Sequence, residues 1–390
     1  MDAIVEDTAP RDRLMAAAAK VSAEVMKDRG AAERLGRTPP NVLDVIYETG
    51  LFRTWLPRAL GGFEADPLTY MDVVEEVSAA DGAVGWNVMN GAGLALTAAY
   101  MPHEVAAAIW DGPKTVVAGQ APPKGRATRV EGGYRITGRW SFGSGILHAT
   151  HVLSGAIIFD GDQPAQMPKG LPPMIHLMTP IAEVSVDTGS WHVSGLRGTG
   201  SCDYALSDVF VPDARTFLFF GSQRFQPGPL YRLPPTLYAY PVAAVMLGIA
   251  RAAVEALVEL AGRPSTAPTP MAERASVQAA LAKADALVGA ARAHLHATLR
   301  DLYDAVQAGP IPDLVRARAR ASAVHAPRLC VEAVDLVWQA AGASAIRETL
   351  VIERCFRDIH AARQHLGIAE DTAIDSGRVM LGLKPREFTF

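Results

Sequence analysis

Two short stretches rich in glycine, serine and aromatic residues have the composition of a binding site for a flat ligand. The first, Gly138–Gly145, holds two aromatic side chains, two hydroxyls and three glycines in eight residues. Glycines let the backbone approach a planar ring closely, and the hydroxyls of Ser141 and Ser144 can hydrogen-bond to a ring nitrogen or carbonyl. The second, Trp191–Ser201, repeats this composition and adds the cation of Arg197. Because both belong to one β-rich segment, the pair indicates a planar cofactor with a polar edge.

Five further residues are of a type that could do chemistry. Trp86, Asn87 and Asn90 lie about one helical turn apart in an apolar segment. This spacing fits either a packed, hydrogen-bonded cluster or the wall of a ligand pocket. His360 and His365 stand among three arginines near the C-terminus. The end of an amphipathic helix often carries such residues with no catalytic role, so the local pattern alone does not decide their function.

The composition is that of an ordinary globular protein. Of 390 residues 49% are hydrophobic and 20% are charged, and 37 basic against 41 acidic residues give a net charge of −4. No basic stripe interleaved with aromatics is visible, which argues against nucleic-acid binding. The three cysteines are scattered and form no CxxC pair or metal-ligand cluster, which fits a reduced cytoplasmic protein without a metal site. The N-terminus lacks the pattern of a secretory signal, and the apolar run 240–250 reads as a buried core helix instead of a membrane span.

The elements needed to position these residues follow the order α, β, α. Helical patterns occur at 11–30, after Pro39–Pro40, at 67–80, 84–100 and 103–110. Short strand-like runs separated by Gly, Pro and Asp fill 115–220, with a hairpin turning at 131–133. Helical patterns return at 241–261, 272–308, 313–341 and 345 to about 365. We therefore expect an α+β multidomain chain with an N-terminal helical domain (1–114), a central β-barrel or sandwich domain (115–225) and a C-terminal four-helix bundle (226–390).

This order, together with particular motifs, resembles the acyl-CoA dehydrogenase fold over nearly the whole chain. More specifically, it resembles the flavin-dependent monooxygenase branch, the oxygenase components of two-component systems. The motifs that carry the resemblance are Leu56-Pro-Arg-Ala-Leu-Gly-Gly62, Gly132-Gly-Tyr-Arg-Ile-Thr-Gly-Arg-Trp-Ser-Phe-Gly-Ser-Gly145, Val193-Ser-Gly-Leu-Arg-Gly-Thr-Gly-Ser201, Trp338-Gln-Ala-Ala-Gly-Ala-Ser344 and Arg354-Cys-Phe-Arg-Asp-Ile-His-Ala-Ala-Arg-Gln-His365. No single motif is diagnostic, but their order and spacing make the fold assignment specific.

The resemblance implies that flavin is held between the domains. The residues that match flavin-contacting positions are Trp140, Ser141, Phe142 and Ser144 in the first loop, and Arg197 and Ser201 in the second. Gln339, Gly342 and Ser344 match the segment that in relatives contacts a neighbouring subunit's flavin. Arg263 stands where relatives place a phosphate-binding arginine, although the loop after it departs from their Phe-Gly pattern. Candidate walls of the substrate pocket are Trp86, Asn87, Asn90 and Tyr238.

The two branches of the fold differ in one catalytic group. An acyl-CoA dehydrogenase needs a carboxylate to remove a proton next to a thioester carbonyl. The position usual for that glutamate falls at about Leu366–Gly367, and the alternative position falls near Tyr238; neither carries an acid. The dehydrogenase base is therefore missing from both sites.

The monooxygenase branch carries a histidine beside this position, and here it is His365. In that branch reduced flavin takes up O2 to form a C4a-hydroperoxide, which transfers an oxygen atom to an electron-rich substrate. The imidazole can accept a substrate proton or hold the peroxide in place. Asp358, seven residues earlier on a continuing helix, would orient the ring. The predicted catalytic residues are thus His365, Ser144 and Asp358; His148, His151 and His360 read as structural or rim residues.

The resulting hypothesis is the cytoplasmic, homotetrameric oxygenase component of a two-component monooxygenase. It would use FADH2 or FMNH2 supplied by a separate NAD(P)H:flavin reductase, together with O2, to hydroxylate an aromatic or heteroaromatic (phenolic, indole or polyketide-like) substrate. No GxGxxG unit is visible for nicotinamide binding. The alternatives left open are N- or S-oxygenation on the same scaffold, an acyl-CoA dehydrogenase with a displaced base, and a scaffold protein that binds no flavin.

Overall fold

The computed structural model describes residues 10–167, 173–219, 224–234, 239–264 and 268–386. Its N-terminal helices are α1 (Pro10–Met26), α2 (Ala31–Leu35), α3 (Pro40–Thr49), α4 (Pro67–Ala80), α5 (Gly82–Leu94) and α6 (His103–Ile109). Aspartates cap the two that matter most for the site. Asp66 accepts hydrogen bonds from the first N–H groups of α4, and Asp81 does the same for α5. The helix expected to reach Tyr100 becomes a 3-10 helix after Leu94.

The central region is one mixed sheet. Its strands are β1 (Val117–Val130), β2 (Gly133–Gly143), β3 (His151–Asp160), β4 (Gln163–Pro164), β5 (Met174–Pro180), β6 (Ser185–Asp187), β7 (Cys202–Pro212) and β8 (Thr216–Phe217). The order is β6-β7-β2-β1-β3-β5-β8, with β4 beside β3; β1 and β3 are parallel, and the other neighbours are antiparallel. The expected hairpin is confirmed, because Val130 pairs with Gly133 and Gly132 adopts a φ of 75° in the turn.

The C-terminal region is built from long helices. They are α7 (Ala239–Ala261), α8 (Ala275–Ala308), α9 (Asp313–Ala341), α10 (Val351–Ala362) and α11 (Asp371–Met380). Two segments, Ala239–Ala261 and Asp313–Ile346, are long and apolar enough to span a membrane, but 72% of the first is buried inside the protein. That burial makes α7 a core helix of the bundle, as the sequence indicated.

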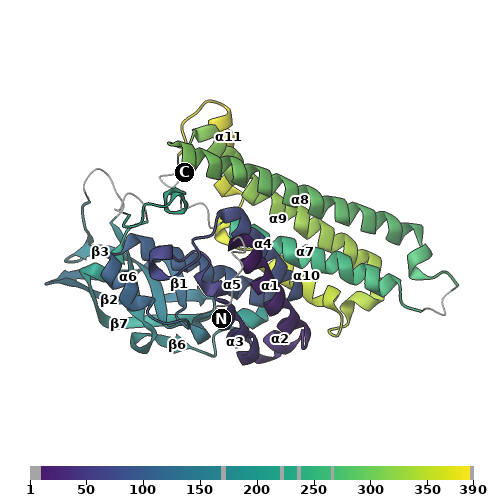
Figure 1. Cartoon of the computed structure of the whole chain (residues 1–390), viewed down its shortest axis with the longest axis horizontal. Coiled ribbons are helices and arrows are strands. Elements are labelled where there is room, and N and C mark those ends of the chain that lie inside the picture. The colour runs from purple at the N-terminus through teal and green to yellow at the C-terminus, as the bar shows by residue number, and fades with distance from the viewer. Residues whose placement is uncertain (1–9, 168–172, 220–223, 235–238, 265–267, 387–390) are drawn as a thin grey trace, which may run out of the picture.

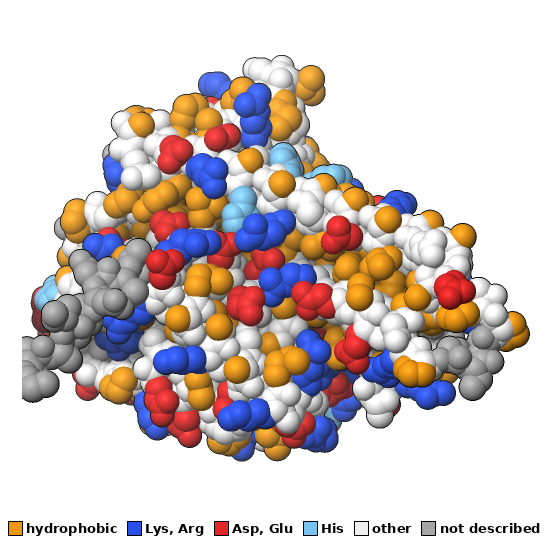
Figure 2. All heavy atoms as spheres, turned by 45° about the vertical axis from the view of Figure 1, so that its right-hand side comes forward, with side chains coloured by type: hydrophobic (Ala, Val, Ile, Leu, Met, Phe, Trp, Pro, Cys, Tyr) orange, Lys and Arg blue, Asp and Glu red, His pale blue; other side chains and the backbone are white. Residues whose placement is uncertain are grey.

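The three regions confirm the acyl-CoA dehydrogenase-like architecture. Figure 1 shows the sheet on one side, the bundle of α7, α8 and α9 on the other, and α1, α4 and α5 between them. One large hydrophobic core runs from α4 and α5 into the bundle, and a separate core lies within the sheet. Figure 2 shows acidic and basic side chains interspersed over one face, with groups of hydrophobic side chains among them. Side chains of α1, α4 and α5 can contact both the sheet and the bundle, because these helices lie between the two.

Candidate active site

His365 lies in a tight turn just after α10. The helix ends at Ala362, and His365, with extended backbone angles, caps the 3-10 helix Leu366–Ile368. Its Nδ1 atom accepts a hydrogen bond from the backbone N–H of Gly367 at 3.1 Å. Arg363 donates from Nη1 to the carbonyl oxygen of Ile368 at 3.0 Å. These two bonds fix the turn and, with it, the direction of the imidazole ring.

The hydrogen bond from Gly367 determines which ring nitrogen of His365 carries the proton. Burial lowers the pKa of His365 to about 4, so the ring is neutral at pH 7. A neutral imidazole has one N–H and one lone pair, and here Nδ1 must carry the lone pair because it accepts from Gly367. The proton therefore sits on Nε2. In this state His365 can donate a hydrogen bond from Nε2, while the lone pair of Nδ1 already accepts from the Gly367 N–H.

Trp86 on α5 joins His365 to the first glycine-rich loop. The two rings meet edge to face, with centroids 5.7 Å apart. The indole Nε1–H of Trp86 donates to Ser144 Oγ at 3.1 Å, and Asn90 Nδ2 donates to the Ser144 carbonyl oxygen at 2.8 Å. Both the side chain and the backbone of Ser144 are thus held by one helix. The structure brings four of the predicted residues (His365, Trp86, Asn90 and Ser144) together.

A chain of hydroxyl groups connects the two predicted flavin loops. Ser144 Oγ lies 2.7 Å from Ser201 Oγ, which lies 2.7 Å from Thr199 Oγ1. Thr199 donates to the carbonyl oxygen of Leu196 at 2.8 Å. Each hydroxyl has a single hydrogen, so Thr199 must accept from Ser201, and Ser201 must accept from Ser144. The hydrogen of Ser144 is therefore used inside the chain, and one of its two lone pairs accepts from Trp86. The hydroxyl of Ser144 can offer a ligand its second lone pair and no hydrogen.

The loop residue Phe142 is an exposed aromatic side chain on an unusual backbone conformation. It has a φ of 68°, a conformation that non-glycine residues rarely adopt, and its side chain is 59% exposed. Gln120 Nε2 donates to its carbonyl oxygen at 2.7 Å, and Trp191 meets its ring edge to face. Ser141, beside it in β2, is partly exposed. An exposed aromatic ring held this way can cover one face of a flat ligand.

Trp140 has a different place from the one predicted. Its side chain is fully buried, stacks on Tyr204 at 5.3 Å and donates from Nε1 to the Gly155 carbonyl oxygen. Strand alternation explains the difference, because neighbouring residues of β2 point to opposite faces of the sheet. The side chain of Trp140 is therefore part of the hydrophobic core of the β domain.

Asp358 does not orient His365, contrary to the sequence-based prediction. The helix stops before His365, so the seven-residue spacing no longer places the two side chains on one face. Asp358 Oδ1 instead accepts from the backbone N–H of Leu196 at 2.5 Å. Burial, followed by the nearby charge of Asp81, raises the pKa of Asp358 to about 7. Its hydrogen-bond partner therefore lies in the second glycine-rich loop, and the like charge of Asp81 lies nearby at the start of α5.

Asn87 is 1% exposed and donates to Thr38 Oγ1 at 2.8 Å, so it joins α5 to the segment before α3. Its Oδ1 lies beside the first glycine-rich loop, 3.5 Å from where a Cβ on Gly145 would be. Tyr238 lies outside the described residues. Arg197 is exposed and pairs with Glu33 at 3.3 Å, and Arg263 is exposed and pairs with Glu259. Both arginine side chains remain accessible to solvent.

Gln339, Gly342 and Ser344 lie where α9 ends and the next 3-10 helix begins. Gln339 and Gly342 are exposed, and Ser344 is partly exposed. The neighbouring Ile346 is 70% exposed, which is high for a large apolar side chain. No described contact joins these three residues to Ser144 or His365 in the single chain. Within one chain, they are separate from the site around His365.

The three other histidines singled out in the sequence, His148, His151 and His360, contact neighbouring side chains. His148 is stacked on Phe52, and burial lowers its pKa to about 4. His151 Nδ1 lies 3.1 Å from Thr150 Oγ1, and His360 Nε2 lies 2.9 Å from Asp335 Oδ1. Sequence reasoning missed three contributors to the site: Thr199, Arg363 and the N–H of Gly367. Thr199 was within a quoted motif, but a hydroxyl chain between two distant loops leaves no signal in residue spacing.

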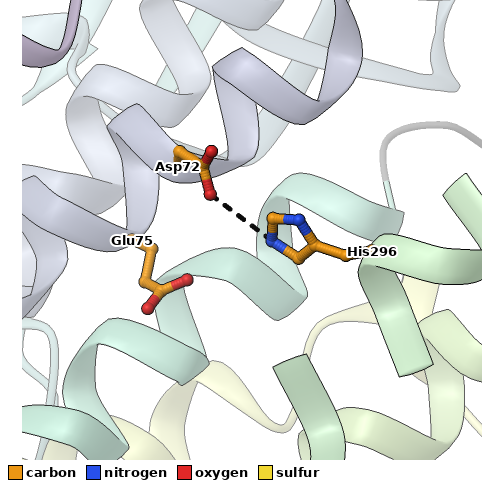
Figure 3. A group of neighbouring side chains, drawn as sticks. All are labelled: Asp72, Glu75 and His296. Atoms are coloured by element: carbon orange, nitrogen blue, oxygen red, sulfur yellow. Dashed lines mark ion pairs between the residues drawn. The ribbon is translucent and has the colours of Figure 1, made fainter. Parts of the chain in front are cut away.

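Asp72, Glu75 and His296 form a cluster of metal-binding residue types (Figure 3). Both acids lie on α4, and His296 approaches from α8. However, Asp72 already pairs with Arg11 at 2.7 Å and Arg292 at 2.6 Å, and Glu75 pairs with Arg292 at 2.9 Å. Arginine guanidinium groups therefore occupy the oxygens that a cation would need. The cluster acts as an ionic link between the N-terminal helices and the bundle.

Comparison with known proteins gives matches over almost the full chain. The model of the acyl-CoA dehydrogenase N-terminal domain matches residues 8–105, and that of the C-terminal domain matches residues 240–370. The chain is 32% identical over 394 residues to an indole-3-acetate monooxygenase of Pseudomonas putida, with 99% of each covered. It is 30% identical to the flavin-dependent monooxygenase oxygenase subunit HsaA of Rhodococcus jostii, over 85% of this chain and 88% of the relative.

Solved structures agree with these relatives. The crystal structure of 3-HSA hydroxylase from Rhodococcus sp. RHA1 superposes with a TM-score of 0.85 at 26% identity, covering 99% of this chain and 100% of that chain. XiaF from Streptomyces sp., in complex with FADH2 and glycerol, superposes with a TM-score of 0.87 at 27% identity, covering 97% and 98%. The shared fold therefore extends over all three regions of the chain.

Proposed function

Because this chain belongs to the flavin-dependent monooxygenases with the acyl-CoA dehydrogenase fold, we propose that it hydroxylates an aromatic or heteroaromatic substrate with reduced flavin and O2. The single observation that carries the proposal is the arrangement around Ser144 and His365. The hydroxyl of Ser144 offers an acceptor and no donor, and His365 offers a donor from Nε2. Reduced flavin carries an N–H at N5, whereas oxidised flavin has a lone pair there, so the acceptor at Ser144 matches the reduced form.

The residues of the site fit a flavin in chemical type. Phe142 presents an exposed ring for one face, and Ser144 presents an acceptor for the polar edge. When bound, reduced flavin supplies the two electrons that allow one atom of O2 to enter the substrate. The balance is reduced flavin, O2 and R–H on one side, and oxidised flavin, R–OH and water on the other. The protein binds and orients the reactants and keeps bulk water away from them.

His365 holds a proton at Nε2 in this proposal. Its neutral state follows from burial, and its orientation follows from the Gly367 N–H. A preorganised donor stabilises negative charge on an oxygen as that charge develops. A general base would instead need a free lone pair at Nε2, which the observed bond to Nδ1 denies it. His365 therefore serves as a hydrogen-bond donor to oxygen, and the substrate proton leaves by another route.

The partners and assembly belong to the same proposal. We place a separate NAD(P)H:flavin reductase upstream, because the relatives named as oxygenase subunits or components are parts of larger systems. We also propose that the protein is a cytoplasmic homotetramer. Self-association is supported by large apolar side chains such as Ile346 and Leu366, which are 70% and 72% exposed in the single chain. Sedimentation analysis tests the assembly: a monomer at micromolar concentration would contradict it.

The test of function is a single-turnover assay. The protein is mixed with chemically reduced FAD or FMN, then with oxygenated buffer containing phenol, resorcinol, indole or indole-3-acetate. We expect a hydroxylated product with at least one substrate, in a yield approaching one per reduced flavin, and slower reoxidation of flavin than in protein-free buffer. Reoxidation at the protein-free rate with no product from any ring would refute the proposal. Reduction of bound flavin by an acyl-CoA without a reductase would favour the dehydrogenase alternative.

A further inference from the structure

Helix α10 contacts three consecutive residues of the second predicted flavin loop, Ser194, Gly195 and Leu196. Arg357 Nη1 donates to the carbonyl oxygen of Ser194 at 2.8 Å. Gly195 lies so close to the helix that a Cβ there would be 2.1 Å from the carbonyl oxygen of Arg357. Asp358 Oδ1 then accepts from the N–H of Leu196 at 2.5 Å. The loop is thus tied to the helix through two hydrogen bonds and one close backbone contact.

Among these three loop residues, Leu196 has the unusual backbone conformation that the contacts with α10 hold in place. Its φ of 54° places it in the left-handed region, which a leucine occupies only when its surroundings impose it. Asp358 holds its N–H, while its carbonyl oxygen accepts from both the N–H and the hydroxyl of Thr199, at 3.1 and 2.8 Å. The hydrogen bonds of Leu196 therefore link Asp358 on α10 to Thr199.

From Thr199 the connection continues to the candidate site. The hydroxyls of Thr199, Ser201 and Ser144 form the chain described above, which ends at the indole N–H of Trp86. Trp86 lies on α5, whose N-terminal cap is Asp81. Asp358 itself packs against the start of α5, since a Cβ on Gly82 would lie 3.4 Å from its Oδ2. The series of contacts therefore starts at Asp358 on α10, passes through the second and first glycine-rich loops to Trp86 on α5, and ends on the helix whose first residue, Gly82, lies beside Asp358.

We propose that Asp358 is a positioning residue, which holds Leu196 in its left-handed conformation and thereby fixes the acceptor face of Ser144 toward the reduced flavin. This inference rests on the proposed function. It gives Asp358 no contact with the flavin and no part in proton transfer. Its effect on the ligand passes through Leu196, Thr199 and Ser201, so it depends on that hydroxyl chain being intact.

The test is a double-mutant cycle between Asp358→Ala and Ser201→Ala, two sites that share no direct contact in the structure. The measured quantity is the dissociation constant for reduced FAD and reduced FMN under anaerobic conditions. We expect each single variant to weaken binding about tenfold, and the double variant to be no weaker than about tenfold, because the second change removes nothing further. Asp358→Asn keeps an acceptor for the Leu196 N–H and should bind within about twofold of the unmodified protein.

Asp375 provides a matched control. It is another buried carboxylate, 2% exposed, and its Oδ1 accepts from the backbone N–H of Arg386 at 3.0 Å, but it lies on α11. Asp375→Ala should lower thermal stability, as Asp358→Ala does, but its effect on flavin binding should be small and additive with Ser201→Ala. A merely structural role for Asp358 predicts the same additive behaviour in both cycles.

A second readout needs no flavin. Hydrogen exchange of the segment 193–201 in the flavin-free protein should speed up in Asp358→Ala and stay near the original rate in Asp358→Asn. If Asp358→Ala does not fold, Asp358→Ser replaces it, because the shorter serine keeps a polar group in the buried site but does not reach Leu196. Additive binding effects, or unchanged exchange of the loop, would overturn the inference. Failure of the unmodified protein to bind reduced flavin would overturn the proposed function instead, and the exchange experiment would still decide whether Asp358 holds the loop.

Discussion

Replacement of His365 by glutamine separates a hydrogen-bond donor from a general base. The amide nitrogen of glutamine lies near the position of imidazole Nε2 and carries N–H groups, but it has no basic lone pair. His365 holds its proton at Nε2 because Nδ1 accepts from Gly367 at 3.1 Å and burial lowers its pKa to about 4. His365→Gln should therefore preserve the donor. His365→Asn should preserve only the acceptor for Gly367, because its shorter side chain ends near Nδ1.

The expected magnitudes follow from the value of one preorganised donor. Loss of such a donor costs about 10²–10³ in rate, so His365→Ala and His365→Asn should fall by that factor. His365→Gln should stay within about tenfold of the original protein. The assay is the single-turnover yield and rate of hydroxylation with a saturating aromatic substrate, with reduced-flavin affinity measured in parallel to show that the site still loads.

The result that would refute this reasoning is equal loss in the glutamine and alanine variants with unchanged flavin affinity. Removal of a general base costs about 10²–10⁴, and glutamine cannot replace it. Such a result would mean that Nε2 is free to accept a proton, and hence that the bond from Gly367 is broken in the working enzyme. A high activity in His365→Asn would equally contradict the assignment of the proton to Nε2.

Three further predictions concern the surroundings of the site. Arg363→Ala removes the bond to Ile368 and should lower the hydroxylation rate about three- to tenfold with little change in reduced-flavin affinity; an unchanged rate would show that the turn holds without it. His148 has a folded pKa of about 4, so stability should fall as pH drops below about 6.5, by roughly 2 kcal/mol between pH 7 and pH 5; urea unfolding of His148→Gln should show this slope reduced. Asp72→Ala should cost about 1–2 kcal/mol, because the paired arginines are partly exposed, while a chelator should leave the melting temperature of the unmodified protein unchanged; a chelator-induced drop would show a bound metal.

The parts of the fold that the sequence predicts are those with local causes. The hairpin at Gly132 needs a positive φ that glycine supplies, and α4 and α5 begin at aspartates that accept from their first N–H groups. The clustering of Ser144 with Trp86 is not local in this sense. Fifty-eight residues separate the two, and only the packing of α5 against the sheet brings the indole N–H to the hydroxyl.

Asp358 shows why the remaining contacts of the site could not be predicted from residue spacing in the sequence. The prediction that it orients His365 assumed that α10 continues for one more turn, since seven residues return to nearly the same helix face. The helix instead ends at Ala362, where Arg363 and the N–H of Gly367 form the turn. A buried carboxylate needs a hydrogen-bond donor, because an unpaired one is costly, and Asp358 accepts from the N–H of Leu196, 162 residues away in sequence. Because the helix ends at Ala362, Asp358 is bound to the second glycine-rich loop and not to the histidine. The hydroxyl chain of that loop connects it to Trp86, whose ring meets that of His365.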